Sequence, residues 1–579
     1  MPSLVPSALP HVLRSCIYLS VPFLAVYFFS CFVHISTWTF VILQTICLPL
    51  YLTARVQIQA LKTQRGAACA GAIFAPPLVG KSFGSADLLA EVMKSYKEGY
   101  LCDRFNEAHT KLGPVFDLHV LWDTITFTID ANIIKTILAT DFNNYVKGEV
   151  YQAFMHSVLG SGVFNADARF HRSMTRPFFS RDRISHFDIF DKHSDAALNK
   201  MKERLAEGHA VDFQDLISRF TLDSASEFLF GKCVNVLESP LPYPPRSPEA
   251  ARQVGVLSLA DRFARAFARA QDTIASRGRL GYIWPWLEIF KDKTKDDMKI
   301  VDAFLNPILK DALEKRRNEV EAGLWQDVDG EEVADEDTFL DHLVRTTTNS
   351  QIIHDEILNI LIAGRDTTAS TLTFAVYFLC MYPHVLRRLR KEILETVGPS
   401  RRPDYNEIKD MKYLRAFLNE VLRLYPAVYA VNDTTIPNPE PNGKPFFIPA
   451  GQGITYSVFL MHRRKDYWGE DAEEFDPDRF LDERIQYILK NPFIFLPFNA
   501  GPRICLGQQF AYNQMSFFLI KLLQNFSEMS LRLDCQDPKT LPPKEWASCP
   551  GRKGIEKMVV KSHLTAYTNG GLWVKMTEA

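Results

Sequence analysis

The stretch Phe498-Asn-Ala-Gly-Pro-Arg-Ile-Cys-Leu-Gly507 sets one cysteine, Cys505, in a turn that contains glycines. An apolar run with helical spacing comes next, over residues 510–523. A thiolate at the start of such a helix is stabilised by unpaired N–H groups and the helix dipole, which lower its pKa. Gly501 and Gly507 let backbone donors approach the sulfur because they lack a Cβ atom. Cys505 could therefore be a redox thiol, a nucleophile or a metal ligand, although a lone cysteine in a turn is usually only a packed residue.

The spacing Phe-x-x-Gly-x-Arg-x-Cys-x-Gly resembles the haem-binding loop of the cytochromes P450. The resemblance implies that Cys505 is the metal ligand, the axial thiolate of a haem b (iron protoporphyrin IX). It also implies that Arg503 pairs with a haem propionate and that Phe498 and Gly507 belong to the cofactor site. A thiolate ligand pushes electron density onto iron and favours O–O cleavage over reversible O2 binding.

Composition narrows the class of protein. The chain has 579 residues, of which 47% are hydrophobic and 23% charged, as in a globular protein. A formal net charge of −2, without a basic stripe, predicts that nucleic acid is not a partner. The ten cysteines are scattered and form no Cys-x-x-Cys pair, which argues against a zinc ribbon or a disulfide scaffold and favours a reducing compartment.

The N-terminal region contains two apolar runs, residues 17–33 and 38–54, without a charged residue. Each approaches the ~20 residues needed to cross a bilayer. A cleaved secretory signal is the alternative, but two consecutive runs exceed the apolar region of a signal and no clear cleavage site comes after them. We therefore predict a membrane anchor, either one span or a hairpin. Arg55, Lys62 and Arg65 favour a cytoplasmic position for the rest of the chain.

The segment Ala75-Pro-Pro-Leu-Val-Gly80 resembles the proline hinge between anchor and catalytic domain in P450s. We accordingly expect an anchor and linker over residues 1–74 and a catalytic domain over residues 75–579. The resemblance implies contact with membrane lipid, at the endoplasmic reticulum, with the catalytic domain on the cytoplasmic side.

Residues 350–382 have apolar positions at helical spacing nearly all round, which predicts a central buried helix. Its middle reads Ala363-Gly-Arg-Asp-Thr-Thr368. A buried hydroxyl there has two explanations: a bond back to the carbonyl four residues earlier, or a local opening of the helix where O2 and water sit. The segment matches the P450 oxygen-activation motif. By that resemblance Asp366 and Thr367 are catalytic in delivering protons to oxygen, Gly364 leaves room beside the haem, and Arg365 is a salt-bridged structural residue.

Two further motifs have a structural role. Residues 406–425 predict a helix that ends at Pro426, and residues 384–397 predict a shorter helix before it. Glu420 and Arg423 match the P450 Glu-x-x-Arg motif, and Arg479 matches the arginine of the next element in the family. The resemblance implies a buried hydrogen-bonded triad of these three side chains.

The resemblance runs from about Pro76 to the C-terminus and implies a mostly α fold with a smaller β region. Two departures stand out. Arg172 matches the cofactor-binding arginine of an early helix, but Ala168 occupies the position of the usual tryptophan, which should weaken haem binding without abolishing thiolate ligation. The loop at residues 427–433 lacks the Pro-x-Asn-x-Arg that is usual in this group of P450s. Because that loop faces the substrate, the resemblance predicts the substrate less firmly than it predicts the fold.

Together these features resemble fungal microsomal alkane and fatty-acid hydroxylases. They imply a haem-thiolate monooxygenase that takes electrons from NADPH through cytochrome P450 reductase and inserts one atom of O2 into a lipophilic substrate, such as a long-chain alkane, a fatty acid or a polycyclic aromatic. The pocket would draw on residues 142–164, the helix near Ala363 and the loop after Pro426. The arginine-rich residues 169–183 would dock the reductase. The alternatives are an isomerase or dehydratase of the same fold that needs no reductase, and a non-catalytic membrane haem-binding protein.

Overall fold

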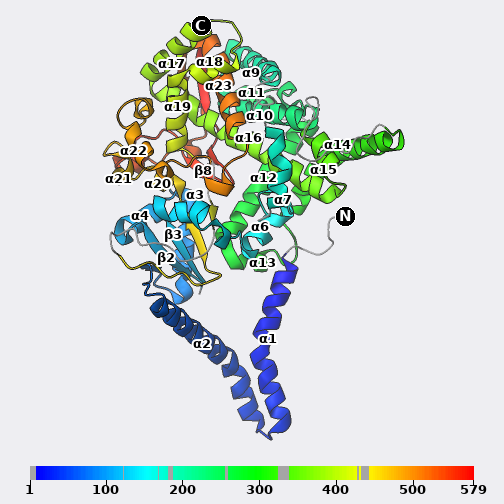
Figure 1. The fold of residues 1–579 in the computed structure, drawn as a ribbon, viewed down its shortest axis with the longest axis vertical. Coiled ribbons are helices and arrows are strands. Elements are labelled where there is room, and N and C mark those ends of the chain that lie inside the picture. The colour runs from blue at the N-terminus through cyan, green and yellow to red at the C-terminus, as the bar shows by residue number, and fades with distance from the viewer. Residues whose placement is uncertain are drawn as a thin grey trace.

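The computed structural model describes residues 8–121, 123–166, 169–179, 187–253, 258–323, 338–426, 430–431 and 443–579. The chain is mainly helical with small sheets to one side, as expected (Figure 1). The first helices are α1 (Leu9–Phe32), α2 (Thr37–Cys69), α3 (Ala86–Glu98), α4 (Asp103–Leu112), α5 (Ala131–Lys135), α6 (Glu149–Leu159), α7 (Arg169–Thr175), α9 (Asp188–Ala206), α10 (Phe213–Phe230), α11 (Pro248–Arg252) and α12 (Leu259–Leu280). Later in the chain come α13 (Trp284–Leu287), α14 (Lys295–Glu321), α15 (Phe339–Thr346), α16 (Ser350–Met381), α17 (Pro383–Thr396), α18 (Tyr405–Asp410), α19 (Lys412–Leu424), α20 (Val458–Met461), α21 (Lys465–Trp468), α22 (Ile485–Lys490), α23 (Gln508–Asn525) and α24 (Arg552–Ile555).

The strands form a five-stranded, a three-stranded and a two-stranded sheet. The five-stranded sheet has the order β1-β2-β3-β6-β5, in which β1 pairs parallel with β2 and β3 parallel with β6, and the other neighbours are antiparallel. In the three-stranded sheet β10 pairs antiparallel with both β4 and β7. The strands are β1 (Pro77–Val79), β2 (Val115–Val120), β3 (Asp123–Thr128), β4 (Val211–Asp212), β5 (Ala430–Val431), β6 (Gly453–Tyr456), β7 (Phe526–Leu531), β8 (Val560–Ser562), β9 (Ala566–Thr568) and β10 (Trp573–Glu578).

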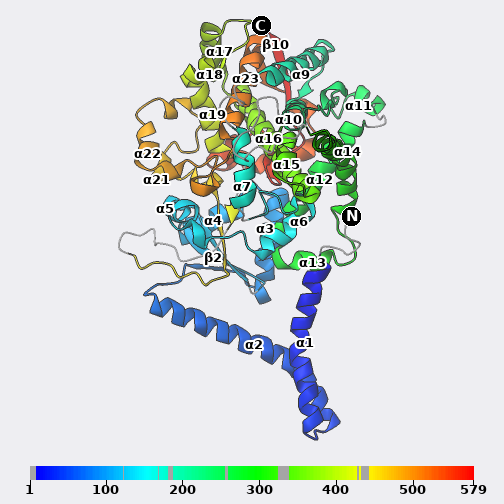
Figure 2. The same cartoon turned by 45° about the vertical axis from the view of Figure 1, so that its right-hand side comes forward.

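Helix α16 lies in the centre of the helical part, as its apolar periodicity predicts (Figures 1 and 2). Asn349 begins it by accepting hydrogen bonds from the backbone N–H groups of Gln351 and Ile352. Residues 368–379 in its C-terminal half are all buried, and Pro383 starts α17 after a bend of 113°. The helices predicted at residues 350–382, 384–397 and after Cys505 are thus confirmed. The single helix predicted from residue 406 is instead two helices, α18 and α19, because the backbone at Met411 is extended.

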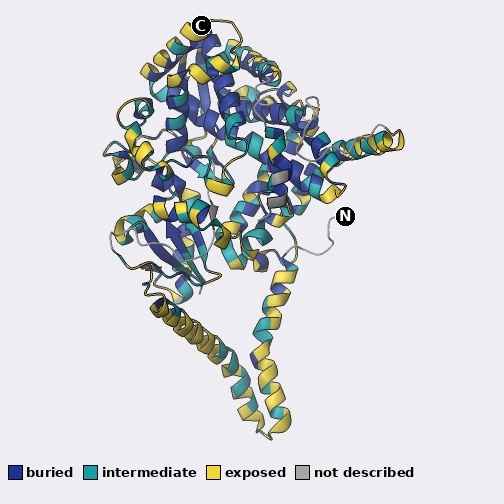
Figure 3. Ribbon diagram, viewed as in Figure 1, coloured by how far each residue is buried: buried dark blue, intermediate teal, exposed yellow. Residues whose placement is uncertain are grey.

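The N-terminal helices α1 and α2 project from the domain and are largely exposed, in contrast to the buried interior of the domain (Figure 3). They run antiparallel and pack against each other, with the rings of Tyr18 and Tyr51 5.9 Å apart and the Gln44 amide donating to the Phe23 carbonyl at 3.3 Å. Both contain a stretch long and apolar enough to cross a membrane. Each helix extends beyond the apolar run that predicted it. The structure therefore contains two packed helices, each long enough to be a span, and the topology of the anchor stays a prediction.

The proline segment expected to be a hinge belongs to the sheet. Ile73 donates its N–H to the Pro445 carbonyl at 2.9 Å and accepts from Phe447 at 2.7 Å. The next residues form edge strand β1, where Leu78 pairs with Leu118. A proline is tolerated at such an edge because its missing N–H faces away from the neighbouring strand. The chain is thus tied to the domain as soon as α2 ends, and the boundary at residue 74 stays a prediction.

The three side chains of the predicted structural triad lie together and are fully buried, but only Glu420 and Arg423 are hydrogen-bonded to each other; Arg479 hydrogen-bonds Asp471 instead. Arg423 makes a two-pronged ion pair with Glu420 at 2.7 and 2.8 Å, and the Nε atom of Arg479 lies 3.6 Å from the same carboxylate. Arg423 also donates to the carbonyls of His462 and Ala472, which lie in the segment between α20 and α22. The triad therefore fastens α19 to the irregular chain that precedes the cysteine loop.

We predict that Glu420→Gln will destabilise the protein by about 3–5 kcal/mol, since the buried Arg423 guanidinium loses its counter-charge, whereas Arg479 keeps its ion pair with Asp471 at 2.9 Å. The matched control is Glu395→Gln on α17, which breaks an exposed ion pair with Lys391 (3.7 Å) and should change stability by less than ~0.5 kcal/mol. Urea unfolding of the detergent-solubilised chain measures both. Equal midpoints for the two variants would contradict the structural role of the triad.

Candidate functional site

The turn that carries Cys505 is fixed by its backbone. The Cys505 N–H donates to the Phe498 carbonyl at 2.9 Å, and Asn499 and Gly501 adopt positive φ angles of 59° and 58°. A Cβ atom at Gly501 would lie 2.2 Å from the carbonyl oxygen of Leu138. Glycine is required here for two reasons, because the conformation is left-handed and because another backbone segment lies against it. The turn therefore presents the cysteine in one position.

The surroundings of the Cys505 sulfur favour its anion more than a plain buried site would. Gly507 caps the N-terminus of α23 directly after it. The residue is exposed, yet enough protein surrounds the sulfur to limit its hydration and raise the pKa of the thiol. The backbone N–H of Gly507 and the guanidinium group of Arg172 both act to lower that pKa. An additional positive charge at the sulfur would complete its conversion to a thiolate.

Two predicted arginines lie at this loop. Arg172 on α7 donates to the carbonyl of Ile504, next to the cysteine. The Nη2 atom of Arg503 donates to the Tyr145 carbonyl at 2.7 Å, and its guanidinium group lies 4.9 Å from the ring centre of Phe142. The structure thus brings both arginines to the cysteine loop, while Ala168 lies outside the described residues. Their role toward a propionate stays a prediction.

The remaining predicted residues of the loop are packing residues in this structure. Phe498 contacts Tyr512 on α23, with ring centres 5.1 Å apart. A Cβ atom at Gly507 would make an ordinary contact, 3.8 Å from the Phe179 ring. Asn499 accepts a hydrogen bond from the Tyr456 hydroxyl at 3.1 Å, which joins the loop to strand β6. The sequence does not predict this last contact, and it connects the cysteine loop to a large cavity.

That cavity, of about 1160 Å³, lies between the sheet, α6 and α16. Ala363 and Thr367 of the central motif form part of its wall. Aromatic and aliphatic side chains dominate the lining; among them are Phe105, Phe127, Phe154, Leu159, Phe164, Ile362, Tyr456 and Leu564. The contribution of residues 142–164 agrees with the prediction. The contributions of β6, of residues 562–565 and of α1 were not predicted, and residues 427–429 after Pro426 lie outside the described part.

The Thr367 hydroxyl donates to the Ala363 carbonyl at 2.7 Å, and α16 continues without interruption through this point. Of the two explanations for a buried hydroxyl, the bond back to the preceding turn is the one that this structure shows. The local opening is not present. Because Thr367 still faces the cavity, its oxygen can accept a hydrogen bond from a water or ligand there.

Asp366 and Arg365 lie next to each other with 3.5 Å between carboxylate and guanidinium atoms, and both are nearly buried. The second oxygen of Asp366, Oδ2, is buried and makes no hydrogen bond to the described residues. The Arg365 pairing agrees with its predicted structural role. A Cβ atom at Gly364 would lie 3.5 Å from that of Ala225 on α10, an ordinary contact, so room for oxygen at Gly364 stays a prediction.

Polar side chains on the N-terminal half of α16 hold the cavity wall in place. Asp355 accepts hydrogen bonds from the backbone and hydroxyl of Ser161 at 2.8 and 3.1 Å. Asn359, one turn later, accepts from the Phe164 N–H and donates to the Leu159 carbonyl, both at 2.9 Å. Sequence reasoning missed this pair. Its signal was an acid and an amide four residues apart in an otherwise apolar helix.

A second contact of the same kind joins α7 to α16. The imidazole of His171 hydrogen-bonds the carboxylate of Glu356, and both side chains are buried. Burial raises the pKa of Glu356, which the neighbouring His171 lowers in part. Because Arg172 is the next residue after His171, this contact also sets the position of the arginine beside the cysteine loop.

The residues at this place fit a haem by the chemistry of their donors. Cys505 offers a soft sulfur ligand that is exposed and that backbone and arginine groups help to ionise. Arg172 and Arg503 supply two cations at the same loop. Tyr456 belongs both to the cavity wall and, through Asn499, to the loop. An iron porphyrin has the matching parts: a metal, two carboxylates and a large apolar face.

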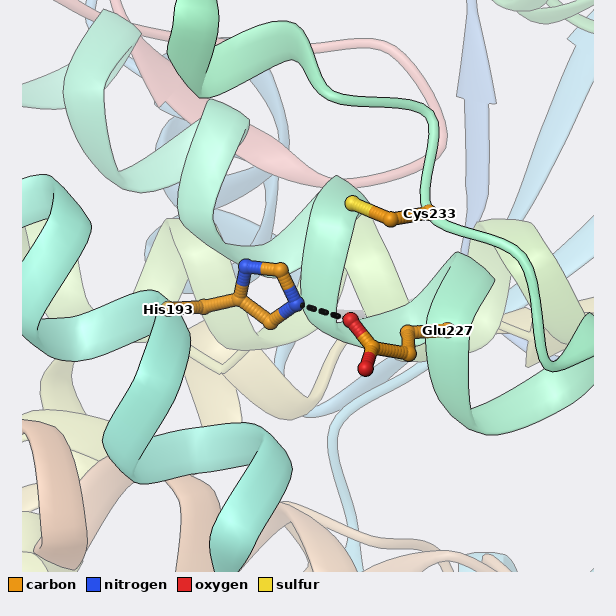
Figure 4. A group of neighbouring side chains, drawn as sticks. All are labelled: His193, Glu227 and Cys233. Atoms are coloured by element: carbon orange, nitrogen blue, oxygen red, sulfur yellow. Dashed lines mark hydrogen bonds and ion pairs between the residues drawn. The ribbon is translucent and has the colours of Figure 1, made fainter.

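A second group of metal-ligating side chains, His193, Glu227 and Cys233, lies on α9, α10 and the segment after it (Figure 4). His193 Nε2 is 2.7 Å from Glu227, and Lys192 donates to both oxygens of that carboxylate at 2.9 and 2.8 Å. Burial and the nearby charge of Asp223 raise the pKa of Cys233 to about 12, so it stays a thiol. A lysine on the carboxylate and a protonated sulfur make this an ion-pair cluster and a poor metal site.

Similarity to known proteins extends over most of the chain. The cytochrome P450 family model matches residues 88–549. The chain is 34% identical over 478 residues to cytochrome P450 52A3-A of Candida maltosa, covering 79% of this chain and 85% of that protein. It is 35% identical over 423 residues to cytochrome P450 52E1 of Candida apicola (70% and 76% covered) and 33% identical over 482 residues to cytochrome P450 52A12 of Debaryomyces hansenii (80% and 88% covered).

Proposed function

Because this chain belongs to the cytochrome P450 family and is therefore a haem-thiolate monooxygenase, we propose that Cys505 is its iron ligand and that the cavity beside α16 binds its substrate. The observation that carries the proposal is the exposed Cys505 thiol between the N-terminus of α23 and Arg172. When bound, haem b supplies the chemistry that activates O2 and inserts one of its atoms into the substrate.

Arg172 and Arg503 are the proposed partners of the two propionates. Each guanidinium group hydrogen-bonds a backbone carbonyl in this structure, and a guanidinium has five N–H donors, so a propionate can be added without breaking these bonds. Arg172 then has two effects, because it contacts the loop at Ile504 and contributes positive charge at the sulfur. Phe498, Gly364 and Gly507 complete the proposed cofactor site as packing and spacing residues.

Asp366 and Thr367 are proposed to deliver the protons that reduction of O2 consumes. The Thr367 oxygen lies on the cavity wall and can accept a hydrogen bond from a water there while its hydroxyl still donates to the Ala363 carbonyl. The Oδ2 atom of Asp366, without a hydrogen bond to the described residues, can take part in proton transfer without first breaking one. This pair also favours the monooxygenase over the isomerase or dehydratase alternative.

The substrate is proposed to be a long-chain alkane, a fatty acid or a polycyclic aromatic, since the lining is mainly apolar. Three arginines interrupt it: Arg14, Arg55 and Arg279. Arg14 already pairs with Glu149, but Arg55 and Arg279 make no ion pair with a carboxylate of the described residues, so a carboxylate substrate would gain a charge-assisted hydrogen bond from one of them that a hydrocarbon would not. Among the three classes we therefore favour the fatty acid.

Location and electron donor are proposed from the anchor. The hairpin of α1 and α2 holds the protein on a membrane, and we propose the endoplasmic reticulum with the domain on the cytoplasmic side. Arg55, Lys62 and Arg65 lie at the end of α2 nearest the domain, and positive charge is typical of the cytoplasmic flank. NADPH–cytochrome P450 reductase is the proposed donor. Arg181 and Arg183, in the predicted docking stretch, lie outside the described residues.

We predict that Cys505→Ala will abolish monooxygenase activity and the red-shifted Soret band of the reduced, CO-bound protein, since that band requires a thiolate ligand. The control is Cys535→Ala, which removes a partly exposed free thiol elsewhere and should leave both unchanged. A thiolate-type band in Cys505→Ala would show that another cysteine binds the iron.

We predict that Thr367→Ala will bind haem and substrate but form less product per NADPH, with peroxide released instead. General acid–base contributions of this type are about 10²–10⁴-fold in rate. The control is Thr373→Ala on the same helix, which makes the same bond to a carbonyl four residues earlier but does not line the cavity. Unchanged coupling in Thr367→Ala, or equal loss in both variants, would contradict the proton-delivery role.

A further inference from the structure

One face of the membrane helix α1 forms part of the cavity wall. Its lining residues are spaced three and four apart and therefore lie on one side of the helix; they are His11, Arg14, Ser15, Tyr18 and Leu19. Arg55 of α2 lines the same cavity. The cavity thus continues from the central helix α16 to the anchor, which lies outside the domain (Figure 2).

Specific contacts keep α1 against the domain at this place. The rings of His11 and Trp284, on α13, are 6.2 Å apart, and Val12 is only 3% exposed. The guanidinium group of Arg14 lies 3.4 Å from the carboxylate of Glu149, the first residue of α6. That ion pair is open to solvent on both sides and so contributes little stability, and it can open at small cost.

The position of this contact relative to a bilayer can be inferred from the side chains. The Arg55 guanidinium of α2 lies 4.3 Å from the ring centre of Tyr18 on α1. The ring of Tyr51, also on α2, packs against the same tyrosine. Tyrosine and arginine together are typical of the boundary between lipid and water. From Leu19 to the turn at residues 33–36, α1 is apolar, and α2 is apolar from that turn to Ala54. The cavity therefore reaches α1 at the membrane boundary.

We propose that α1 is the outer wall of the substrate entrance, so that a lipophilic substrate moves from the bilayer past Ser15 and Leu19 into the cavity. This inference rests on the proposed function, which assigns the cavity to the substrate. It gives the anchor a second role, because the hairpin then shapes the site as well as holding it on the membrane. The charged pair Arg14–Glu149 spans the same entrance and marks its boundary with water.

The test uses the full-length, haem-loaded protein in lipid nanodiscs. Leu19→Trp adds bulk on the cavity face of α1, and Leu19→Ala removes it. The matched control is Ile17→Trp, the same enlargement on a side chain that is 68% exposed and does not line the cavity. A long-chain fatty acid is delivered from vesicles, and its association rate is measured by stopped-flow through the change in haem absorbance.

We expect Leu19→Trp to slow association about tenfold, Leu19→Ala to leave it as fast or faster, and Ile17→Trp to match the wild type. A slower association in Leu19→Trp that neither Leu19→Ala nor Ile17→Trp shares cannot come from a general fault in membrane insertion. Haem content and the CO spectrum should be the same in all four proteins. Equal association rates in Leu19→Trp and Ile17→Trp would overturn the entrance while leaving the proposed function intact. If the haem-loaded wild type binds no long-chain ligand, both the proposed substrate class and the proposed entrance at α1 are wrong.

Discussion

The function of this chain depends on one backbone constraint, the left-handed turn at Asn499 and Gly501 that sets the position of Cys505. Only glycine can occupy position 501, because the Leu138 carbonyl lies where a side chain would begin. The same turn is bonded through Asn499 to the cavity wall at Tyr456, and it ends where α23 begins. One local conformation therefore fixes the sulfur relative to the helix dipole, the cavity and Arg172 at once.

Helix α16 carries two kinds of polar residue. One kind holds neighbouring segments in place, and the other lies at the site. Asp355, Glu356 and Asn359 in its first half hold the neighbouring backbone and His171 in place. Asp366 and Thr367 in its middle make fewer contacts of this kind. Thr367 lines the cavity, and Asp366 has one buried oxygen without a hydrogen bond to the described residues. Buried polar groups are costly unless they are hydrogen-bonded. The hydrogen bonds of Asp355 and Asn359 thus explain the position of the cavity wall, whereas Thr367 lines the cavity and is the part of the helix available for chemistry.

The sequence allowed prediction of the elements whose periodicity or spacing is local. Helices α16, α17 and α23, the buried Glu420–Arg423 pair and the P450 fold itself were all predicted and are confirmed, while Arg479 lies beside that pair without a hydrogen bond to Glu420. The break at Met411 was not, because the apolar pattern continues across it. That the proline segment forms strand β1 was not predicted, since its partner β2 lies about forty residues away in the chain; its role as the hinge between anchor and domain stays a prediction. Contacts of α1 with α6 and α13 join residues far apart in sequence, and no local pattern predicts them.

The central claim, that a cysteine thiolate binds the iron, can be tested directly by resonance Raman spectroscopy of the ferric full-length protein. Protein made with heavy-isotope sulfur in its cysteines is compared with unlabelled protein. The account predicts an iron–sulfur stretching band that moves to lower frequency on labelling in the wild type and is absent from Cys505→Ala. A spectrum without any sulfur-sensitive band, or with an iron–ligand band that instead responds to heavy nitrogen in histidine, would contradict it.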